Sequence, residues 1–346
     1  MIDIKSFTIS QVETYIKTLG EPSFRAKQIF IWLHQKQAES FEQMTNLSAA
    51  LRLRLAKECY INAITVQKKL TSALDGTQKY LFALRDGETV ESVLMKYKHG
   101  TSLCISTQVG CKMGCTFCAS TLMGLCRNLT ASEMLDEVYL AAKEAGERID
   151  SVVLMGIGEP LDNLQNVLAF LENLSSPNGV NLGARHVSLS TCGLVPQIYE
   201  LLETKPQVTL SISLHAPNNA LRDKLMPVNH KYNIDELMRA CGAYFKATGR
   251  RISYEYSLIN GVNDTEECAM ELAKLLRGQV AHVNLIPVNE VKEHEHKKSS
   301  KARVQAFLNV LEKHKITATV RRELGTDISA ACGQLRRAEK GDKVSD

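Results

Sequence analysis

The sequence predicts an α/β protein: a partial, open (β/α)6 barrel, preceded by a small helical N-terminal domain and an antiparallel strand layer. Three observations predict this fold. From residue 102 onward, strand-like and helical segments alternate six times, which is typical of a parallel sheet with right-handed crossovers. The first 60 residues show helical periodicity only. Between these parts, strand-like runs are separated by Asp-Gly pairs, which favour hairpins.

The N-terminal part predicts three helices, at residues 10–19, 24–35 and 49–59. Their apolar residues recur at helical spacing, and Ser48 is placed to cap the third helix. This third helix carries three basic side chains, Arg52, Arg54 and Lys57. They fit either a solvated face or an RNA contact, and the sequence leaves both interpretations open.

The next part, residues 61–100, predicts a small antiparallel layer. Strand-like runs fall at residues 64–66, 80–84 and 90–95, with Asp75-Gly76 and Asp86-Gly87 between them. These dipeptides are strong hairpin signals because both residue types tolerate the backbone of a tight turn. We expect this layer to lead directly into the barrel.

The barrel is predicted from six strands and the helices between them. The strand candidates are residues 102–107, 151–155, 186–191, 208–214, 251–258 and 282–287. The clearest helix is 131–145, which Thr130 and Glu133 begin as a capping box. The other helices are expected near residues 163–174, 233–247, 265–276 and 300–313. Because six units are two fewer than a closed barrel needs, we expect an open one.

These elements divide the chain into four expected parts. Residues 1–60 form a helical accessory domain, 61–100 a β-hairpin extension, 101–320 the partial barrel and 321–346 a C-terminal tail. The composition, with 44% hydrophobic and 23% charged residues among 346, suits one large globular body with a small appended domain. The net charge of +4 is compatible with a nucleic-acid partner but does not demonstrate one.

Ten cysteines raise the question of the compartment. The chain begins with a short polar stretch in place of a secretory leader, and no run approaches the roughly 20 apolar residues of a membrane span. We therefore expect a cytoplasmic protein without membrane contact, in a reducing compartment. There, clustered cysteines indicate a metal or catalysis rather than structural disulfides.

Three of these cysteines, Cys111, Cys115 and Cys118, form a CxxxCxxC loop after the first barrel strand. Thiolates are the usual ligands of a [4Fe–4S] cluster, which normally takes four, so three would leave one iron open. The spacing, with Phe117 before the last cysteine, resembles the radical S-adenosylmethionine (SAM) signature. In that superfamily the open iron binds SAM, and an electron splits it into methionine and a 5′-deoxyadenosyl radical. The alternatives are a structural zinc site, which wants four closed ligands, and three buried thiols without a metal.

Several unusual residues follow the other predicted strands at the end where barrel active sites form. They are Gly156, Gly158 and Glu159 after strand two, Ser190 in strand three, Ser213, Leu214 and His215 at strand four, and Asn289 after strand six. Each alone is an ordinary strand-end residue, and the glycines alone are ordinary turn residues. Around one cluster, they predict contacts to the ribose, adenine and amino-acid parts of SAM. Glu159 would offer a carboxylate to an amino or hydroxyl group.

Two further cysteines stand out by position. Cys104 lies on strand one, and Cys332 lies near the C-terminus before Gly333. A buried core thiol is the ordinary interpretation of each, and the residues alone do not pair them. We keep the core interpretation for the remaining cysteines, Cys59, Cys126, Cys192, Cys241 and Cys268.

Taken together, the chain resembles the RlmN/Cfr class of radical-SAM RNA methyltransferases over nearly its whole length. The resemblance rests on the helical N-terminal domain, the cluster loop and these motifs: Val90-Glu91, Leu103-Cys104-Ile105-Ser106, Arg127-Asn128-Leu129-Thr130, Gly158-Glu159-Pro160, Ser213-Leu214-His215 and Ala331-Cys332-Gly333-Gln334-Leu335.

The resemblance implies that one SAM methylates the Cys332 thiolate and that a second SAM supplies the radical. The S-methyl carbon then adds to an adenine, and Cys104 releases the product through a transient disulfide with Cys332. Glu91 would accept the ring proton, which requires burial because an ordinary carboxylate is a weak base. Without that role, Glu91 would be one half of a surface ion pair.

The resemblance also implies the substrates. One subclass methylates carbon 2 of an adenine in 23S rRNA and in some tRNAs, and the other methylates carbon 8 of the ribosomal adenine. Gly158-Glu159-Pro160 and Ala119-Ser120-Thr121 favour the carbon-2 subclass. An electron donor such as flavodoxin or ferredoxin, a monomeric state and an RNA-binding role for residues 1–60 are implied as well. The alternatives are a radical-SAM enzyme acting on a peptide or small molecule and an RNA-binding protein with a structural metal.

Overall fold

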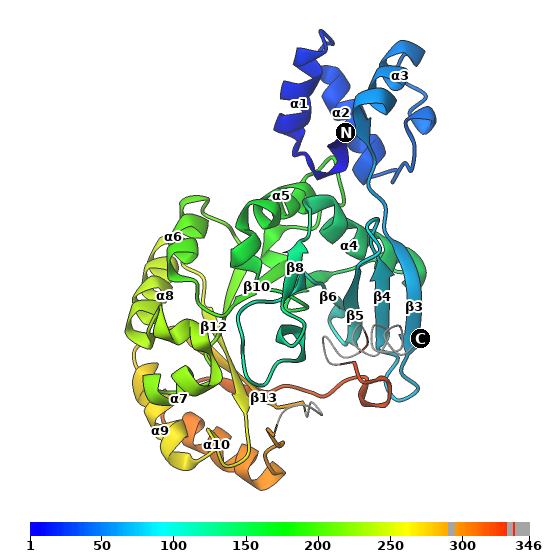
Figure 1. Cartoon of the computed structure of the whole chain (residues 1–346). Helices are drawn as coiled ribbons and strands as arrows, with labels where there is room; N and C mark the ends of the chain where they lie inside the picture. Colours follow the sequence, from blue (N-terminus) through cyan, green and yellow to red (C-terminus); the bar gives the residue numbers. More distant parts are fainter. Residues whose placement is uncertain (290–294, 331–334, 336–346) are drawn as a thin grey trace.

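The computed structural model describes residues 1–289, 295–330 and 335. Its N-terminal helices α1 (Ile9–Thr18), α2 (Phe24–His34) and α3 (Ala49–Glu58) form a separate lobe above the sheet (Figure 1). Thr8 and Ser48 cap α1 and α3 through their side-chain oxygens, as expected of such residues at a helix start. This lobe buries a core of its own, which includes Ile16, Phe30 and Leu55. The three predicted helices are confirmed.

The rest of the chain is built on one ten-stranded sheet with the order β14-β13-β12-β11-β10-β9-β6-β5-β4-β3. Its antiparallel part consists of β3 (Thr65–Thr71), β4 (Gln78–Ala83) and β5 (Thr89–Tyr97). These strands do not form a layer of their own, because β5 pairs with the first barrel strand, β6, from Val93 opposite Cys104 to Tyr97 opposite Gly100. The antiparallel strands therefore extend the barrel wall.

The parallel part has the predicted alternation. The six predicted strands are present as β6 (Gly100–Cys104), β9 (Ser151–Leu154), β10 (Val187–Thr191), β11 (Thr209–Ser213), β12 (Ile252–Leu258) and β13 (Ala281–Pro287). The predicted helices are α4 (Ala131–Ala145), α5 (Leu164–Ser175), α8 (Ile234–Thr248), α9 (Glu266–Leu275) and α10 (Lys301–Lys313). The elements that were not predicted include α6 (Val195–Glu203), α7 (Asn219–Leu225) and the edge strand β14 (Ala318–Val320). The sheet stays open, so the α/β partial barrel is confirmed.

The two faces of the parallel strands differ in chemistry. On β12, Tyr254 and Tyr256 point into the apolar core shared with the helices, which also holds Leu210 and Ile212 of β11. The alternate positions carry polar side chains, such as Glu255, whose Oε1 accepts a hydrogen bond from Ser211 Oγ at 2.7 Å. Because strand side chains alternate between faces, the concave side of the barrel is lined with polar groups.

A small hairpin carries the cysteine loop. Its strands are β7 (Gln108–Gly110) and β8 (Leu125–Asn128), which pair antiparallel. Gly110 adopts φ 81°, and a Cβ there would lie 1.9 Å from the carbonyl oxygen of Gly124. Only glycine allows this contact. The hairpin joins the two ends of the loop, and so it fixes the position at which the loop with the three cysteines begins and ends.

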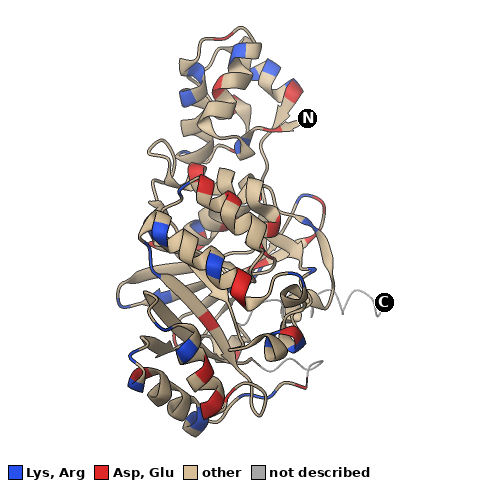
Figure 2. Cartoon of the chain, turned by 90° about the vertical axis from the view of Figure 1, so that its left-hand side faces the viewer, with Lys and Arg blue, Asp and Glu red and all other residues tan. Residues whose placement is uncertain are grey.

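Polar contacts dock the N-terminal lobe on α4. Lys5 forms a buried ion pair with Asp136, and Ser132 Oγ donates to Asp3 Oδ2 at 2.5 Å. Figure 2 shows that both basic and acidic residue positions occur along the helices of this lobe. Arg52 Nη1 donates to the Glu42 carbonyl at 2.7 Å, so one of the three basic side chains of α3 stabilises the lobe itself. Among the described helices, none has the length and apolar character that crossing a membrane requires.

Candidate functional site

The cluster loop, residues 111–118, is tied to the barrel by its backbone. The Cys111 amide donates to the Gly124 carbonyl at 2.9 Å, and the Cys118 amide donates to the Cys115 carbonyl at 3.1 Å. The Thr116 amide donates to the carbonyl of Leu225 at 3.0 Å, which connects the loop to the end of α7. These bonds fix the backbone of the loop that carries the three thiols.

The three thiols form an electrostatic group. Burial raises the pKa of the Cys111 thiol to about 12, and the neighbouring Cys118 raises it further. Burial also raises the pKa of Cys115, with added contributions from Cys118 and Cys111. Three such thiols become thiolates together only beside compensating positive charge, which iron ions provide.

The chemistry of this donor set fits an iron–sulfur cluster, whose usual ligands are thiolates. Among the described residues, no group of three His, Cys, Asp or Glu side chains is arranged to hold a single metal ion. In a cubane each thiolate binds a different iron, so the ligands need not converge on one point. Cys111, Cys115 and Cys118 would therefore hold three irons of a [4Fe–4S] cluster.

A cavity of about 480 Å³ opens beside this loop on the concave side of the barrel. Cys118 and Phe117 of the loop line it, together with Cys104 of β6 and Asn289 after β13. The segment of residues 321–330, here named the terminal segment, closes another side. Figure 1 shows this segment, in red, crossing the open end of the barrel toward β3–β5. The structure thus brings three of the predicted site residues together with the chain that leads to Cys332.

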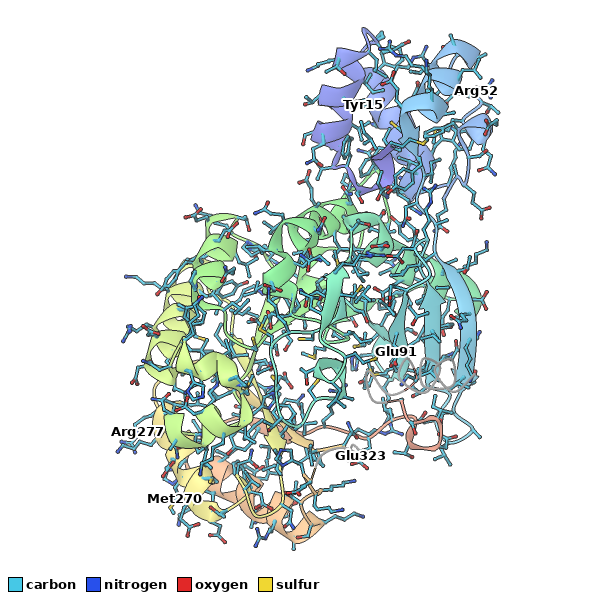
Figure 3. All side chains as sticks on the ribbon, viewed as in Figure 1. Tyr15, Arg52, Glu91, Met270, Arg277 and Glu323 are labelled. Atoms are coloured by element: carbon cyan, nitrogen blue, oxygen red, sulfur yellow. The ribbon has the colours of Figure 1, made fainter. Side chains whose placement is uncertain are left out.

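The strand position of Glu91 had left a surface ion pair as the alternative to a catalytic role, but the ion pair that Glu91 forms is buried. Its side chain is 2% exposed, and one carboxylate oxygen lies 3.0 Å from Nζ of Lys79, which is also fully buried. Strand alternation places Glu91 on the same face of β5 as Val93 and Met95, which line the cavity. In Figure 3, Glu91 lies on the strands toward which the terminal segment, marked by Glu323, extends. Glu91 is therefore a buried carboxylate with a buried counter-charge, and its role as proton acceptor stays a prediction.

The two glycines after β9 are explained by protein packing. A Cβ on Gly156 would lie 2.5 Å from the Ile105 carbonyl oxygen, and one on Gly158 would lie 2.6 Å from Cβ of Gln108. Glu159 is buried, with Oε1 accepting from the Leu161 amide at 3.0 Å and Oε2 from the Cys192 amide at 2.7 Å. Glu159 therefore joins the ends of β9 and β10, and its contact to a ligand stays a prediction.

The residues at the ends of β10 and β11 lie close together. Ser190 Oγ and Ser213 Oγ are 3.4 Å apart, and the Leu214 amide donates to the Glu255 carbonyl at 3.0 Å. His215 packs edge-on against Phe117, with ring centroids 4.8 Å apart. These contacts link the predicted SAM residues of β11 to the cluster loop.

The protonation state of His215 follows from its surroundings. Burial, together with the nearby positive charge of Arg222, lowers the pKa of its imidazole to about 3. Its Nδ1 accepts a hydrogen bond from the Ser257 amide at 2.9 Å. The neutral ring therefore carries its proton on Nε2, which leaves that nitrogen as a hydrogen-bond donor.

Arg222, on α7, is a site residue that the sequence analysis missed. Its side chain is fully buried, and its guanidinium donates to the carbonyls of Cys192, Ser213 and Leu214 at 2.6, 3.2 and 3.2 Å. No described carboxylate forms an ion pair with it within 4 Å. Arg222 therefore braces the two strand ends and places a positive charge near Cys115. A long-range contact of this kind leaves no local signal in the sequence.

The predictions for the cysteines outside the cluster loop are confirmed for some residues and wrong for one. Cys104 is buried in the cavity wall, and Cys332 lies outside the described residues. The structure therefore lends no support to a disulfide between them. Cys126 is exposed on β8, so its prediction as a core thiol was wrong: β8 belongs to a two-stranded sheet and not to the main sheet around which the core is built. Cys192, which is buried as predicted, packs in the same apolar cluster as Cys115.

Comparison with known proteins decides the family. Residues 105–276 match the radical SAM superfamily, and residues 2–61 match the ribosomal RNA large subunit methyltransferase N-terminal domain. A probable dual-specificity RNA methyltransferase RlmN of Lachnoclostridium phytofermentans is 53% identical over 97% of this chain and 95% of its own length. The chain belongs to the RlmN family of radical-SAM RNA methyltransferases.

Further relatives agree over the same length. A probable dual-specificity RNA methyltransferase RlmN of Clostridium perfringens strain SM101 is 54% identical over 98% of this chain and 97% of its own length. A crystal structure of a radical SAM methyltransferase from Sphaerobacter thermophilus has a TM-score of 0.89 and 43% identity, and the match covers 96% of this chain and 99% of that one. Membership of the RlmN family implies a [4Fe–4S] cluster and SAM as cofactors, and RNA as the substrate.

Proposed function

We propose that this enzyme methylates carbon 2 of an adenine in 23S rRNA and in some tRNAs, through a methyl group first placed on Cys332. The curated relatives are named dual-specificity RNA methyltransferases, which supports ribosomal and transfer RNA as the two substrates. The observation that carries the proposal is the cavity, because Cys104, Cys118 and the residues leading to Cys332 all line it. An adenine has to leave its base stack to enter such a cavity.

Each proposed residue has a distinct part. Cys111, Cys115 and Cys118 would hold the cluster, which when bound supplies the electron that cleaves SAM. Ser190, Ser213, His215 and Asn289 would orient SAM, with His215 donating from Nε2. Leu214 would contribute through its backbone, because its side chain is fully buried in the core. Gly158 and Glu159 would support the same edge of the sheet.

The remaining chemistry falls to three side chains. Cys332 would accept the methyl group and carry its carbon to the adenine, and holding that carbon in place gives a large proximity advantage. Glu91 would take the proton from the ring, with Lys79 as its buried counter-charge at 3.0 Å. Cys104 would then attack the Cys332 sulfur, releasing the product and leaving a transient disulfide that a reductant must open.

The proposal extends to partners and organisation. The four parts of the chain are residues 1–60 for RNA binding, 61–100 as strand extension, 101–320 as the catalytic barrel and 321–346 as the tail carrying Cys332. Arg321 and Arg322 line the cavity, and guanidinium groups suit contacts to RNA phosphates. We propose a cytoplasmic monomer that takes electrons from a donor such as flavodoxin or ferredoxin.

A knockout and its complementation test this function. Nucleoside mass spectrometry of 23S rRNA and tRNA should show 2-methyladenosine in cells with the protein and none in cells without it. The Cys118→Ala variant, which removes one proposed ligand, should lose bound iron and fail to restore the base. If complementation restored 8-methyladenosine, the carbon-8 alternative would hold. If no modified adenosine depended on the protein, the proposal would be wrong.

A further inference from the structure

Two turns that are distant in sequence are bound to each other beside the cavity. The hairpin turn, residues 72–77, joins β3 to β4, and the terminal turn, residues 325–330, ends the terminal segment. Asp327 Oδ1 accepts a hydrogen bond from Ser72 Oγ at 2.6 Å, and its Oδ2 accepts one from the Ala73 amide at 2.9 Å. One carboxylate of the terminal turn is therefore held by two donors of the hairpin turn.

The hairpin side also holds both ends of the terminal turn. Asp75 Oδ2 accepts a hydrogen bond from the Gly325 amide at 2.9 Å, and Lys79 Nζ donates to the Ser329 carbonyl at 2.9 Å. The same Lys79 ammonium pairs with Glu91, the proposed proton acceptor. The contacts therefore connect the position of the terminal turn to that of the Glu91 carboxylate.

Backbone geometry makes the terminal turn compact. Gly325 adopts φ 61°, and the Ala330 amide donates to its carbonyl at 3.0 Å, which closes the turn. A Cβ on Gly325 would lie 2.6 Å from Cβ of Ala330 and 3.1 Å from Cγ2 of Thr77. Glycine is therefore required at the point where the two turns touch.

The opposite side of the terminal turn faces the cavity. Leu324 and Ala330 pack against Val93, Met95 and Cys104, and all five residues line the cavity. The terminal turn thus lies between the hairpin turn and Cys104. Cys332 follows Ala330 by two residues, and two residues span at most about 7 Å.

We propose that the hairpin turn is a clamp that positions the terminal turn, and with it the start of the chain that carries Cys332, at the cavity beside Cys104. Asp327, Asp75 and Lys79 are the positioning residues of this clamp. The inference rests on the proposed function of Cys332. To that function it adds the element that positions the chain just before this cysteine. Because Asp327 is exposed, its bonds add little to global stability, and their loss should act on the reaction rather than on the fold.

Three variants test the clamp. Asp327→Ala removes both acceptors, whereas Asp327→Asn keeps a carbonyl oxygen for the Ala73 amide and an amide group for Ser72 Oγ. Leu74→Ala is the matched control, because the Leu74 side chain lies in the same hairpin turn and is 71% exposed. All three are purified with the cluster in place, and their iron content and unfolding midpoint are measured first.

The expected result separates positioning from folding. Asp327→Ala should retain iron and its unfolding midpoint, yet hydrogen exchange in the peptide covering residues 321–330 should accelerate about tenfold or more. Its S-methylated fraction of Cys332 and its yield of modified adenine should fall about 10- to 100-fold, as misplacement of a reacting group predicts. Asp327→Asn should recover most of both losses, and Leu74→Ala should match the unchanged protein.

Two outcomes would contradict the clamp, and a third would contradict the proposed function instead. If Asp327→Ala exchanged and methylated like the unchanged protein, the hairpin turn would not position the terminal turn. If it lost iron or unfolded earlier together with activity, its role would be structural. If the unchanged protein itself formed no S-methylcysteine and no modified adenine, the proposed function would fail, whereas the exchange measurement would still report on the clamp.

Discussion

Glu137 shows how burial sets the charge of a single group in this protein. It lies on α4, fully buried, where Oε2 accepts hydrogen bonds from Ser92 Oγ at 2.5 Å and from the Ser106 amide at 3.0 Å. Burial raises the pKa of its carboxyl group well above the ordinary value of 4.5, against these two hydrogen bonds. Burial therefore favours the neutral, protonated form of Glu137 in the folded protein.

This assignment predicts a pH dependence of stability. Between pH 4.5 and the raised pKa, the folded state holds a proton that the unfolded state has lost, so stability falls as pH rises. Glu137 contributes about 1.4 kcal/mol of this loss per pH unit. Glu137→Gln, which resembles the neutral acid, should lack that contribution, so its free energy of unfolding should fall less steeply than that of the unchanged protein as the pH rises above 4.5. Equal slopes in denaturant titrations across this range would show that Glu137 is ionised.

At the residue scale, local spacing reveals some site residues and not others. Cys111, Cys115 and Cys118 were predicted because their spacing is itself the signal, and the structure gathers them on one loop. Arg222 was not predicted, since its bonds to Cys192 and Ser213 depend on where α7 packs. The same holds for His296, whose Nε2 lies 3.1 Å from Thr116 Oγ1 in the cluster loop.

At the scale of elements, the sharpest test concerns the close approach of β9 to β6. The Cβ of Gly156→Ala would meet the Ile105 carbonyl oxygen at 2.5 Å and the Ser106 amide nitrogen at 2.8 Å, and both are backbone atoms. The strand ends would have to separate, which we expect to lower the free energy of unfolding by about 1 to 3 kcal/mol. The variant should also hold less iron, because the cluster loop follows the same stretch of chain.

A second glycine provides the control for this prediction. Gly242 lies within α8, and a Cβ there would meet nothing within 4 Å. Gly242→Ala should therefore leave iron binding unchanged and increase stability by up to about 1 kcal/mol, since alanine favours the helix. Thermal unfolding and iron content of both variants test the pair. Equal behaviour of the two would mean that the approach of β9 to β6 is not tight.

The elements that the sequence predicted share strong end signals. Helix α4 was predicted with its observed bounds because Thr130 and Glu133 form a capping box and Gly146 ends the helix in the left-handed conformation. Helix α7 and strand β14 were missed because they have seven and three residues, too few for a periodic pattern. The antiparallel strands were predicted to lead into the barrel, but the pairing of β5 with β6 was not, since it depends on partners that a local pattern does not name.

At the scale of the whole molecule, two long-range connections set the site. The N-terminal lobe is fixed to α4 through Lys5 and Asp136, 131 residues apart. The terminal turn is fixed to the hairpin turn through Asp327 and Ser72, 255 residues apart. Asp75 was interpreted as a turn residue only, and its bond to the Gly325 amide became visible in the folded chain. Burial opposes ionisation of Asp75, but this bond and those from Thr77 lower its pKa to about 2.

The molecule as a whole thus arranges a cluster loop, a polar barrel interior and a returning terminal segment around one cavity. We propose above all that the new methyl carbon reaches adenine through Cys332 and not directly from SAM. The most direct measurement supplies SAM with a fully deuterated methyl group to the reconstituted enzyme and weighs the modified adenosine over many turnovers. We predict a new methyl group with two deuterium atoms, the third in 5′-deoxyadenosine, and no product from Cys332→Ala. A methyl group that kept all three deuterium atoms, or product from the variant, would contradict the account.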